Sequence, residues 1–189
     1  MPRVLLCAVM LLALHPPVSF AQDPSATRVR AKLDLIGYEV ARPGSNIVFP
    51  PDEVNAWVRE ELAESVPRGV RESRVTFGTD TLELSALVDI RKIAEKDGKI
   101  NAMVAKLLEG ERPVRMSLRT ASAAGRLTVF LTAVEISGLP VTGAALDLLV
   151  RAVLLPLYPS AKINEAFDLE YRMERVTVEP SGIRVLIKP

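Results

Sequence analysis

The stretch "PVRMSLRTASAAGRLTVFLTAVEISG", residues 113–138, indicates the fold class because apolar and polar residues alternate in it on both sides of a turn. The alternating apolar residues are Val114, Met116 and Leu118 before the turn, and Leu127, Val129 and Leu131 after it. A period of two is typical of a strand with one buried and one wet face. Two such runs around Ala124-Gly125 predict a β-hairpin.

The alternation changes phase near the end of the second run. Val134 and Ile136 have the opposite parity to Leu131, so a regular strand would turn them towards the wet face. A β-bulge at Ala133-Val134 would restore their facing, and bulges also bend the sheet. We therefore expect a bulge here and a strongly curved sheet.

Two further hairpins are predicted on either side of this stretch. Residues 70–90 hold two runs around Gly78-Thr79-Asp80, and residues 167–187 hold two more around Pro180-Ser181-Gly182. The predicted strands have about eight to twelve residues, longer than the usual five or six. The three hairpins predict about six antiparallel strands.

Helical patterns precede or separate these hairpins. The predicted helices cover residues 24–40, 50–65, 99–110 and 141–157. An order of helices between strand pairs predicts an α+β fold rather than a parallel βαβ sheet. We expect a helical N-terminal segment over 22–45 and a single α+β domain over 46–189.

The helix predicted over residues 141–157 has few polar residues. Its only charges are Asp147 and Arg151, four residues apart and so on one face, which marks its solvent-facing edge. A surface helix shows a single apolar stripe, so the remaining surface of this helix must be covered. We expect the curved sheet to wrap around it and leave a groove for acyl chains. The residues predicted to line the groove are Leu146, Leu149, Val150 and Val153.

The first residues, 1–21, have the pattern of a secretory signal peptide. Arg3 precedes an apolar run from Val4 to Leu14, and the small residues Ser19 and Ala21 precede a predicted cleavage after Ala21. The apolar run is too short to span about 30 Å of hydrocarbon as a helix. We expect a periplasmic or secreted protein.

Loss of this segment limits the available chemistry. Cys7 and His15 are the only cysteine and histidine of the sequence, so the mature chain would lack disulfides, thiol or Ser-His nucleophiles, and zinc sites built from these residues. The acidic residues lack the spacing of a calcium loop. The near-neutral charge, without a basic run, argues against nucleic acid as a partner. We predict no catalytic residue, metal or cofactor.

Three segments carry a resemblance to a known family. "FPPDEVNAWVREEL" (49–62), "VDIRKI" (88–93) and "GRLTVFLTAVEISGLPV" (125–141), followed by an apolar helix, resemble the periplasmic phospholipid-binding family named after LmeA. That family is related in architecture to the tubular lipid-binding proteins, in which a curved sheet wraps a long helix beside an apolar groove. The resemblance implies a phospholipid or another acyl-chain lipid as ligand, and contact with a membrane surface. It implies no catalytic residue.

Three function classes follow, in this order. The first is an exported, non-enzymatic protein that binds acyl chains between sheet and helix. The second, ranked nearly level, is a structural or protein-interaction domain of the cell envelope without a ligand. The third is an enzyme that uses carboxylates alone, such as a glycosidase. Aromatic residues form only 5% of the chain, which argues against sugar-binding platforms.

Overall fold

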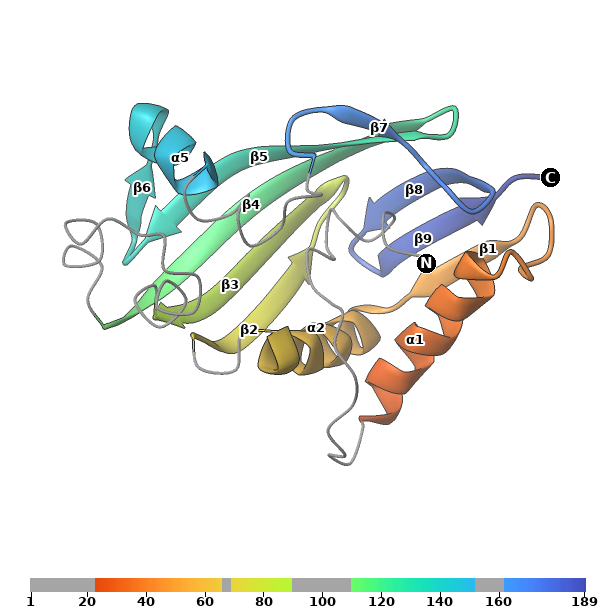
Figure 1. Ribbon diagram of the computed structural model, residues 1–189, viewed down its shortest axis with the longest axis horizontal. Coiled ribbons are helices and arrows are strands. Elements are labelled where there is room, and N and C mark those ends of the chain that lie inside the picture. Colours follow the sequence, from red (N-terminus) through yellow and green to blue (C-terminus); the bar gives the residue numbers. More distant parts are fainter. Residues whose placement is uncertain (1–22, 66–68, 90–109, 152–161) are drawn as a thin grey trace.

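The computed structural model describes residues 23–65, 69–89, 110–151 and 162–189 (Figure 1). The predicted signal peptide and, apart from Gly110, the helix predicted over 99–110 lie outside these ranges. Within them, no helix is long and apolar enough to cross a membrane. The described elements, in chain order, are α1 (Pro24–Gly37), β1 (Asn46–Phe49), α2 (Pro51–Ser65), β2 (Val70–Phe77), β3 (Thr81–Asp89), β4 (Glu111–Ala123), β5 (Arg126–Ile136), β6 (Leu139–Val141), α5 (Gly143–Leu149), β7 (Ala166–Asp168), β8 (Met173–Glu179) and β9 (Gly182–Ile187).

The fold is α+β, as predicted, and its larger sheet has six antiparallel strands. The order is β2-β3-β4-β5-β6, and β7 also pairs with β5. The first two hairpins, β2–β3 and β4–β5, form as predicted. A bulge also forms, one residue before the predicted Ala133-Val134: Ser117 pairs with Ala133 whereas Leu118 pairs with Leu131, so Thr132 is the extra residue. Val134 then pairs with Met116, and its side chain returns to the apolar face.

The third hairpin departs from the expected single sheet. β8 and β9 pair as predicted, but they join β1 in a separate three-stranded sheet of order β1-β9-β8. The alternating residues 167–173 are also not one strand, because Ala166–Asp168 pairs with β5. Tyr171 and Arg172 then adopt positive φ angles of 54° and 57°. This turn has no glycine, so the sequence pattern did not reveal it.

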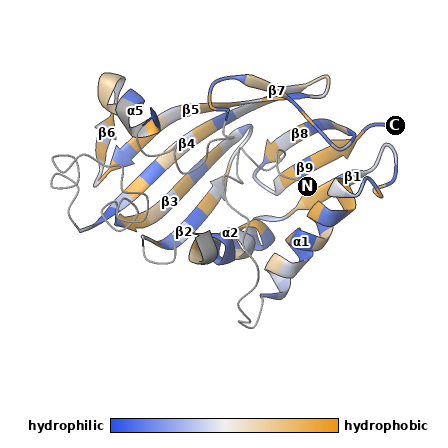
Figure 2. Ribbon diagram, in the orientation of Figure 1, coloured by the Kyte–Doolittle hydropathy of each residue, from blue (hydrophilic) through white to orange (hydrophobic). Residues whose placement is uncertain are grey.

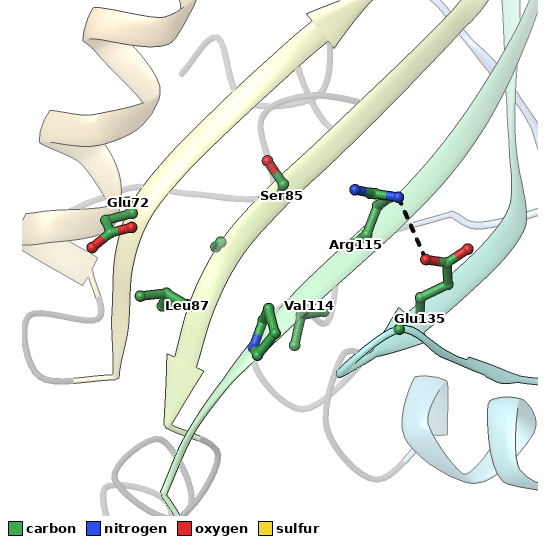
Figure 3. Close-up of a pocket in the computed structure, with 9 residues that line it drawn as sticks. Glu72, Ser85, Leu87, Val114, Arg115 and Glu135 are labelled. Carbon is green, nitrogen blue, oxygen red and sulfur yellow. Dashed lines mark ion pairs between the residues drawn. The ribbon is translucent and has the colours of Figure 1, made fainter.

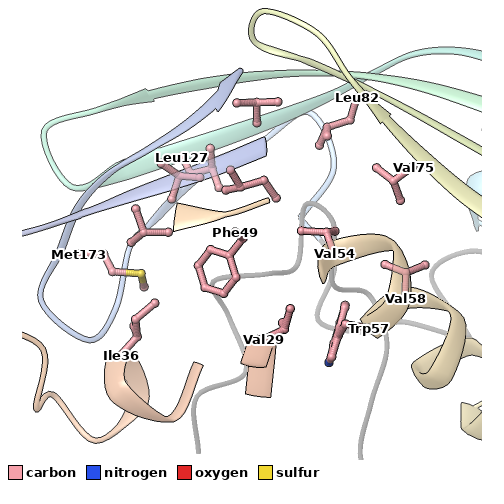
Figure 4. Close-up of a cluster of buried hydrophobic side chains, with 14 of the residues drawn as sticks. Val29, Ile36, Phe49, Val54, Trp57, Val58, Val75, Leu82, Leu127 and Met173 are labelled. Carbon is pink, nitrogen blue, oxygen red and sulfur yellow. The ribbon is translucent and has the colours of Figure 1, made fainter. Parts of the chain in front are cut away.

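The main core lies between the two sheets and the helices α1 and α2. Side chains from both helices, both sheets and the connections near them form one buried cluster, part of which is drawn in Figure 4. Trp57 is 3% exposed and Met173 is fully buried, which confirms that Trp57 is a core residue. Residues Ala26, Val29 and Ile36 of α1 belong to the same cluster. The N-terminal helix therefore packs as part of the domain core.

Helices α1 and α2 are joined by charged contacts around a buried carboxylate. Glu53, in the first turn of α2, is 6% exposed. Its Oε1 accepts a hydrogen bond from Arg28 Nε at 2.8 Å, and its Oε2 pairs with Lys32 Nζ. The carboxylate also lies near the positive end of the α2 dipole. Burial of Glu53 is thus compensated by two cations from α1.

Two asparagines satisfy backbone groups of the larger sheet, one at its β2 edge and one on β5 between the segments paired with β7 and β6. On β2, Val75 N donates to Asn55 Oδ1 at 2.7 Å, and Asn55 Nδ2 donates to Val75 O at 2.9 Å. On β5, Asn164 N donates to Val129 O at 2.8 Å, and Leu131 N donates to Asn164 Oδ1 at 3.1 Å. Each asparagine satisfies backbone groups that a neighbouring strand would otherwise pair. Edges closed in this way resist pairing with other chains.

The apolar helix predicted over residues 141–157 was expected on the concave side of the curved sheet, and its described residues do not lie there. α5 begins after Thr142 and lies at the β6 end of the larger sheet (Figure 1), while residues 152–157 are outside the description. Of the three described helices, α1 and α2 pack on the core. Ala144 and Ala145 on α5 are exposed and offer little apolar area, whereas the α2 stripe includes the buried Trp57. The larger sheet is open, and its described core face packs on α2 and the smaller sheet.

Candidate functional site

One face of the larger sheet is apolar across all of its long strands. Residues directly paired in antiparallel strands point to the same face, so the register assigns each side chain to a face. One apolar row across the sheet consists of Val75, Leu84, Met116, Val134 and Val141. The next row consists of Ala86, Val114, Ile136 and Leu139. Figure 2 shows hydrophobic and hydrophilic bands alternating along β3 and β4.

Among the described residues, the main core covers only part of this apolar face. Leu82, Leu118 and Leu127, which lie towards the β2–β3 and β4–β5 turns, belong to the buried core cluster. On β3, β4, β5 and β6, eight described apolar residues of the same face do not, and we call them the apolar extension. They are Ala86, Val88, Val114, Met116, Val134, Ile136, Leu139 and Val141. Val134 is buried, Leu139 is 70% exposed and the other six are half-buried.

The structure describes two of the four predicted groove residues in full. Leu146 and Val150 are half-buried, and their spacing of four places them on one side of the helix. Leu149 is the last residue of α5, with its side chain outside the description, and Val153 lies outside the described residues. α5 follows β6 directly, so Leu146 lies five residues after Val141, the last member of the apolar extension.

The residues of the apolar extension were not predicted as site residues. For the residues of β3, β4 and β5, the alternation predicted strands and did not identify a site. Alternation identifies the face on which a side chain lies, but not which element covers that face. The signal that could have found them is the length of β3, β4 and β5, whose apolar alternation exceeds what one short helix covers.

The opposite face of the sheet holds a cleft of about 390 Å³ (Figure 3). It is lined by Glu72, Ser85, Leu87, Pro113, Arg115, Glu135 and Gly138, together with Ala86 and Val114, which the register assigns to the apolar face. Ser85 pairs with Arg115, and Arg115 with Glu135, so these three side chains form one row across β3, β4 and β5. Arg115 Nε lies 3.3 Å from Glu83 Oε1, and its Nη1 lies 3.6 Å from Glu135 Oε2.

The chemistry of this cleft favours ion pairing over catalysis. Glu72 lies in an irregular part of β2, where the register shifts between Arg71 and Arg74, and has a positive φ of 54°. Ser85 lies beside Arg115, and a guanidinium has no acceptor and cannot serve as a general base. Arg115 is 54% exposed and lies between two carboxylates, which gives the pairs modest energies. We interpret them as cross-strand contacts of a solvated sheet face.

The described ranges contain no candidate metal centre. No three His, Cys, Asp or Glu side chains gather there in a group able to hold an ion. The expectation that the whole protein needs neither metal nor cofactor stays a prediction.

Comparison of the chain with protein-family models, with curated proteins and with solved structures found no match in any of the three.

Proposed function

We propose that this protein is an exported, non-enzymatic lipid-binding protein that holds acyl chains against the apolar extension. The observation that supports the proposal is an apolar sheet face that continues over β3, β4, β5 and β6 beyond the core formed by the described residues. An apolar surface of this kind on a sheet is a common feature of interaction and ligand sites. α5, with Leu146 and Val150 half-buried, lies beside it.

An estimate of the free energy gained by burying an acyl chain supports such binding. Burial of about ten CH₂ groups gives about 8 kcal/mol at roughly 0.8 kcal/mol per group. Association and ordering then reduce this value substantially. A longer chain or a second chain adds to the gain, so a phospholipid or another acyl-chain lipid is a reasonable ligand. Met116 adds a flexible side chain that adapts to irregular apolar partners.

The compartment and the partners are parts of the same proposal. The signal-like residues 1–21 support export to the periplasm or the exterior, where such a protein would exchange lipid with a membrane surface. The resemblance to the LmeA family supports the same function and stays a prediction.

The direct test is native mass spectrometry of the purified protein, followed by lipid uptake from phospholipid vesicles after delipidation. We expect co-purified lipid in the first experiment and uptake in the second. Met116→Gln places an amide on the apolar extension and should reduce uptake several-fold. Leu87→Gln is the matched control, since Leu87 is also half-buried but lies on the opposite face. A wild-type protein that carries no lipid and accepts none would refute the proposal.

A specific observation favours the second candidate, a protein-interaction domain. Four of the five large apolar residues that are exposed in the described ranges lie on α1, on β1 or between them: Leu35, Tyr38, Val40 and Val48. This surface lies at the opposite end of the molecule from β6 and α5 (Figure 1). If lipid uptake is absent, this reading takes first place. The substitution Val40→Asp should then weaken binding to a partner identified independently, while thermal stability is retained.

A further inference from the structure

A single charged residue lies among the paired positions of the apolar face. Arg112 of β4 pairs directly with Val88 of β3, so its side chain is on the same face as the apolar extension. Among the paired residues of that face in β2, β3, β4, β5 and β6, Arg112 alone carries a charge. It is exposed and stands two residues, or about 7 Å along the strand, from Val114.

Arg112 also differs in its contacts from four other arginines of the larger sheet. Arg115, Arg71 and Arg126 each pair with a carboxylate of the described chain. Arg119 lies over the ring of Phe130, 4.1 Å from its centroid. No described residue forms an ion pair with Arg112. Its guanidinium therefore offers hydrogen-bond donors at the end of an apolar surface.

We propose that Arg112 binds the headgroup of a long-chain monocarboxylate, a fatty-acid-like anion whose tail lies on the apolar extension. This inference rests on the proposed function and specifies its ligand. One guanidinium complements one negative charge, and its planar donors match the two oxygens of a carboxylate. The row of Ala86, Val114, Ile136 and Leu139 crosses four strands, a width of about 14 Å at roughly 4.8 Å per strand. It provides the surface for the tail.

The test compares two ligands with the same chain and different headgroups. Oleate and oleyl alcohol are titrated into delipidated full-chain protein below their aggregation concentrations, at pH 8 and low ionic strength. An exposed charged contact predicts that wild type binds oleate about five- to tenfold more tightly than the alcohol. Arg112→Gln should reduce this preference to less than twofold and leave the affinity for the alcohol unchanged. Because Arg112 is exposed, the thermal midpoint of the Arg112→Gln variant should match that of the wild type.

The matched control is Arg74→Gln. Arg74 is exposed, pairs with Ser85 on the opposite face and has no ion pair with a described residue, so the variant should keep the preference for oleate. Equal binding of both ligands, or a preference that survives Arg112→Gln, would overturn the inference and leave the lipid-binding function intact. Tighter binding of a single-chain phospholipid than of oleate would overturn the carboxylate assignment. If the wild type binds neither oleate nor the alcohol, the proposed function fails together with the inference.

Discussion

Asn55 allows a sharp test of how the larger sheet is closed at its β2 edge. Its side chain forms the two hydrogen bonds with the backbone of Val75, and its Nδ2 also donates to Pro51 O at 2.8 Å. Asn55→Ala removes all three. The substitution leaves the backbone N–H and C=O of Val75 without these partners. Both groups lie on the β2 edge of the larger sheet, which α2 covers. Val75 itself is 3% exposed, so water replaces the lost contacts poorly.

The magnitude follows from the two backbone groups. Each buried group that loses its partner costs about 1–3 kcal/mol. Partial hydration at the half-buried position of Asn55 favours the lower half of the range, so we expect a loss of about 3 kcal/mol in the free energy of unfolding. For a domain of this size, 1 kcal/mol lowers the thermal midpoint by roughly 2–4 °C. The expected decrease is therefore about 6–12 °C.

Urea denaturation followed by circular dichroism and by fluorescence measures this change. Trp57 is the only tryptophan of the sequence and is 3% exposed, so its emission reports on unfolding of the core. Asn55→Asp keeps the acceptor for Val75 N–H but sets a carboxylate oxygen against Val75 O, and should also destabilise. Asn46→Ala, at an exposed position on β1, should stay within about 0.5 kcal/mol of wild type. A change within that margin for Asn55→Ala as well would contradict the predicted contribution of these hydrogen bonds.

Three further predictions concern stability, each measured as a change in the thermal or urea midpoint. Gly182→Ala should reduce the free energy of unfolding by about 4 kcal/mol, because the added Cβ would lie 2.1 Å from Phe49 O at a φ of +120°. Gly44→Ala, which has open space around it, should reduce it clearly less. Equal losses in the two variants would contradict the steric argument. Glu53→Ala should cost about 2 kcal/mol, because it removes the partner of two cations on α1, and a smaller loss at high salt would be expected. EDTA and a reductant should each leave the midpoint unchanged, and a drop of several degrees with EDTA would indicate a carboxylate metal site.

Local sequence patterns were sufficient for the individual elements. Two hairpins and a bulge were predictable because the alternation of apolar and polar residues, and its change of phase, involve residues that are neighbours in the sequence. Helix α1 was predictable from apolar spacing, and α2 from Pro51 and the acidic residues after it. Trp57 was correctly assigned to the core from its place on the α2 stripe. These features depend on interactions within a few residues.

Tertiary structure decided how the elements combine. Residues 167–173 alternate in sequence, yet β7 joins the larger sheet and β8 the smaller one, because the chain turns at Tyr171 and Arg172. In the sequence, nothing distinguishes Asn55 from another polar helix residue. Its role depends on the position of β2 beside α2. Side-chain roles of this kind depend on contacts between residues distant in the chain.

The candidate site shows the same division. The sequence alone determined that an apolar and a polar face exist on the long strands, because alternation in a strand assigns side chains to faces. Only the tertiary structure decided which part of the apolar face is core, through the packing of α2 and the smaller sheet at one end. The register likewise placed Arg112 beside Val88. Strand pairing is a long-range interaction, and no local pattern specifies which residues of two separate strands become opposite neighbours.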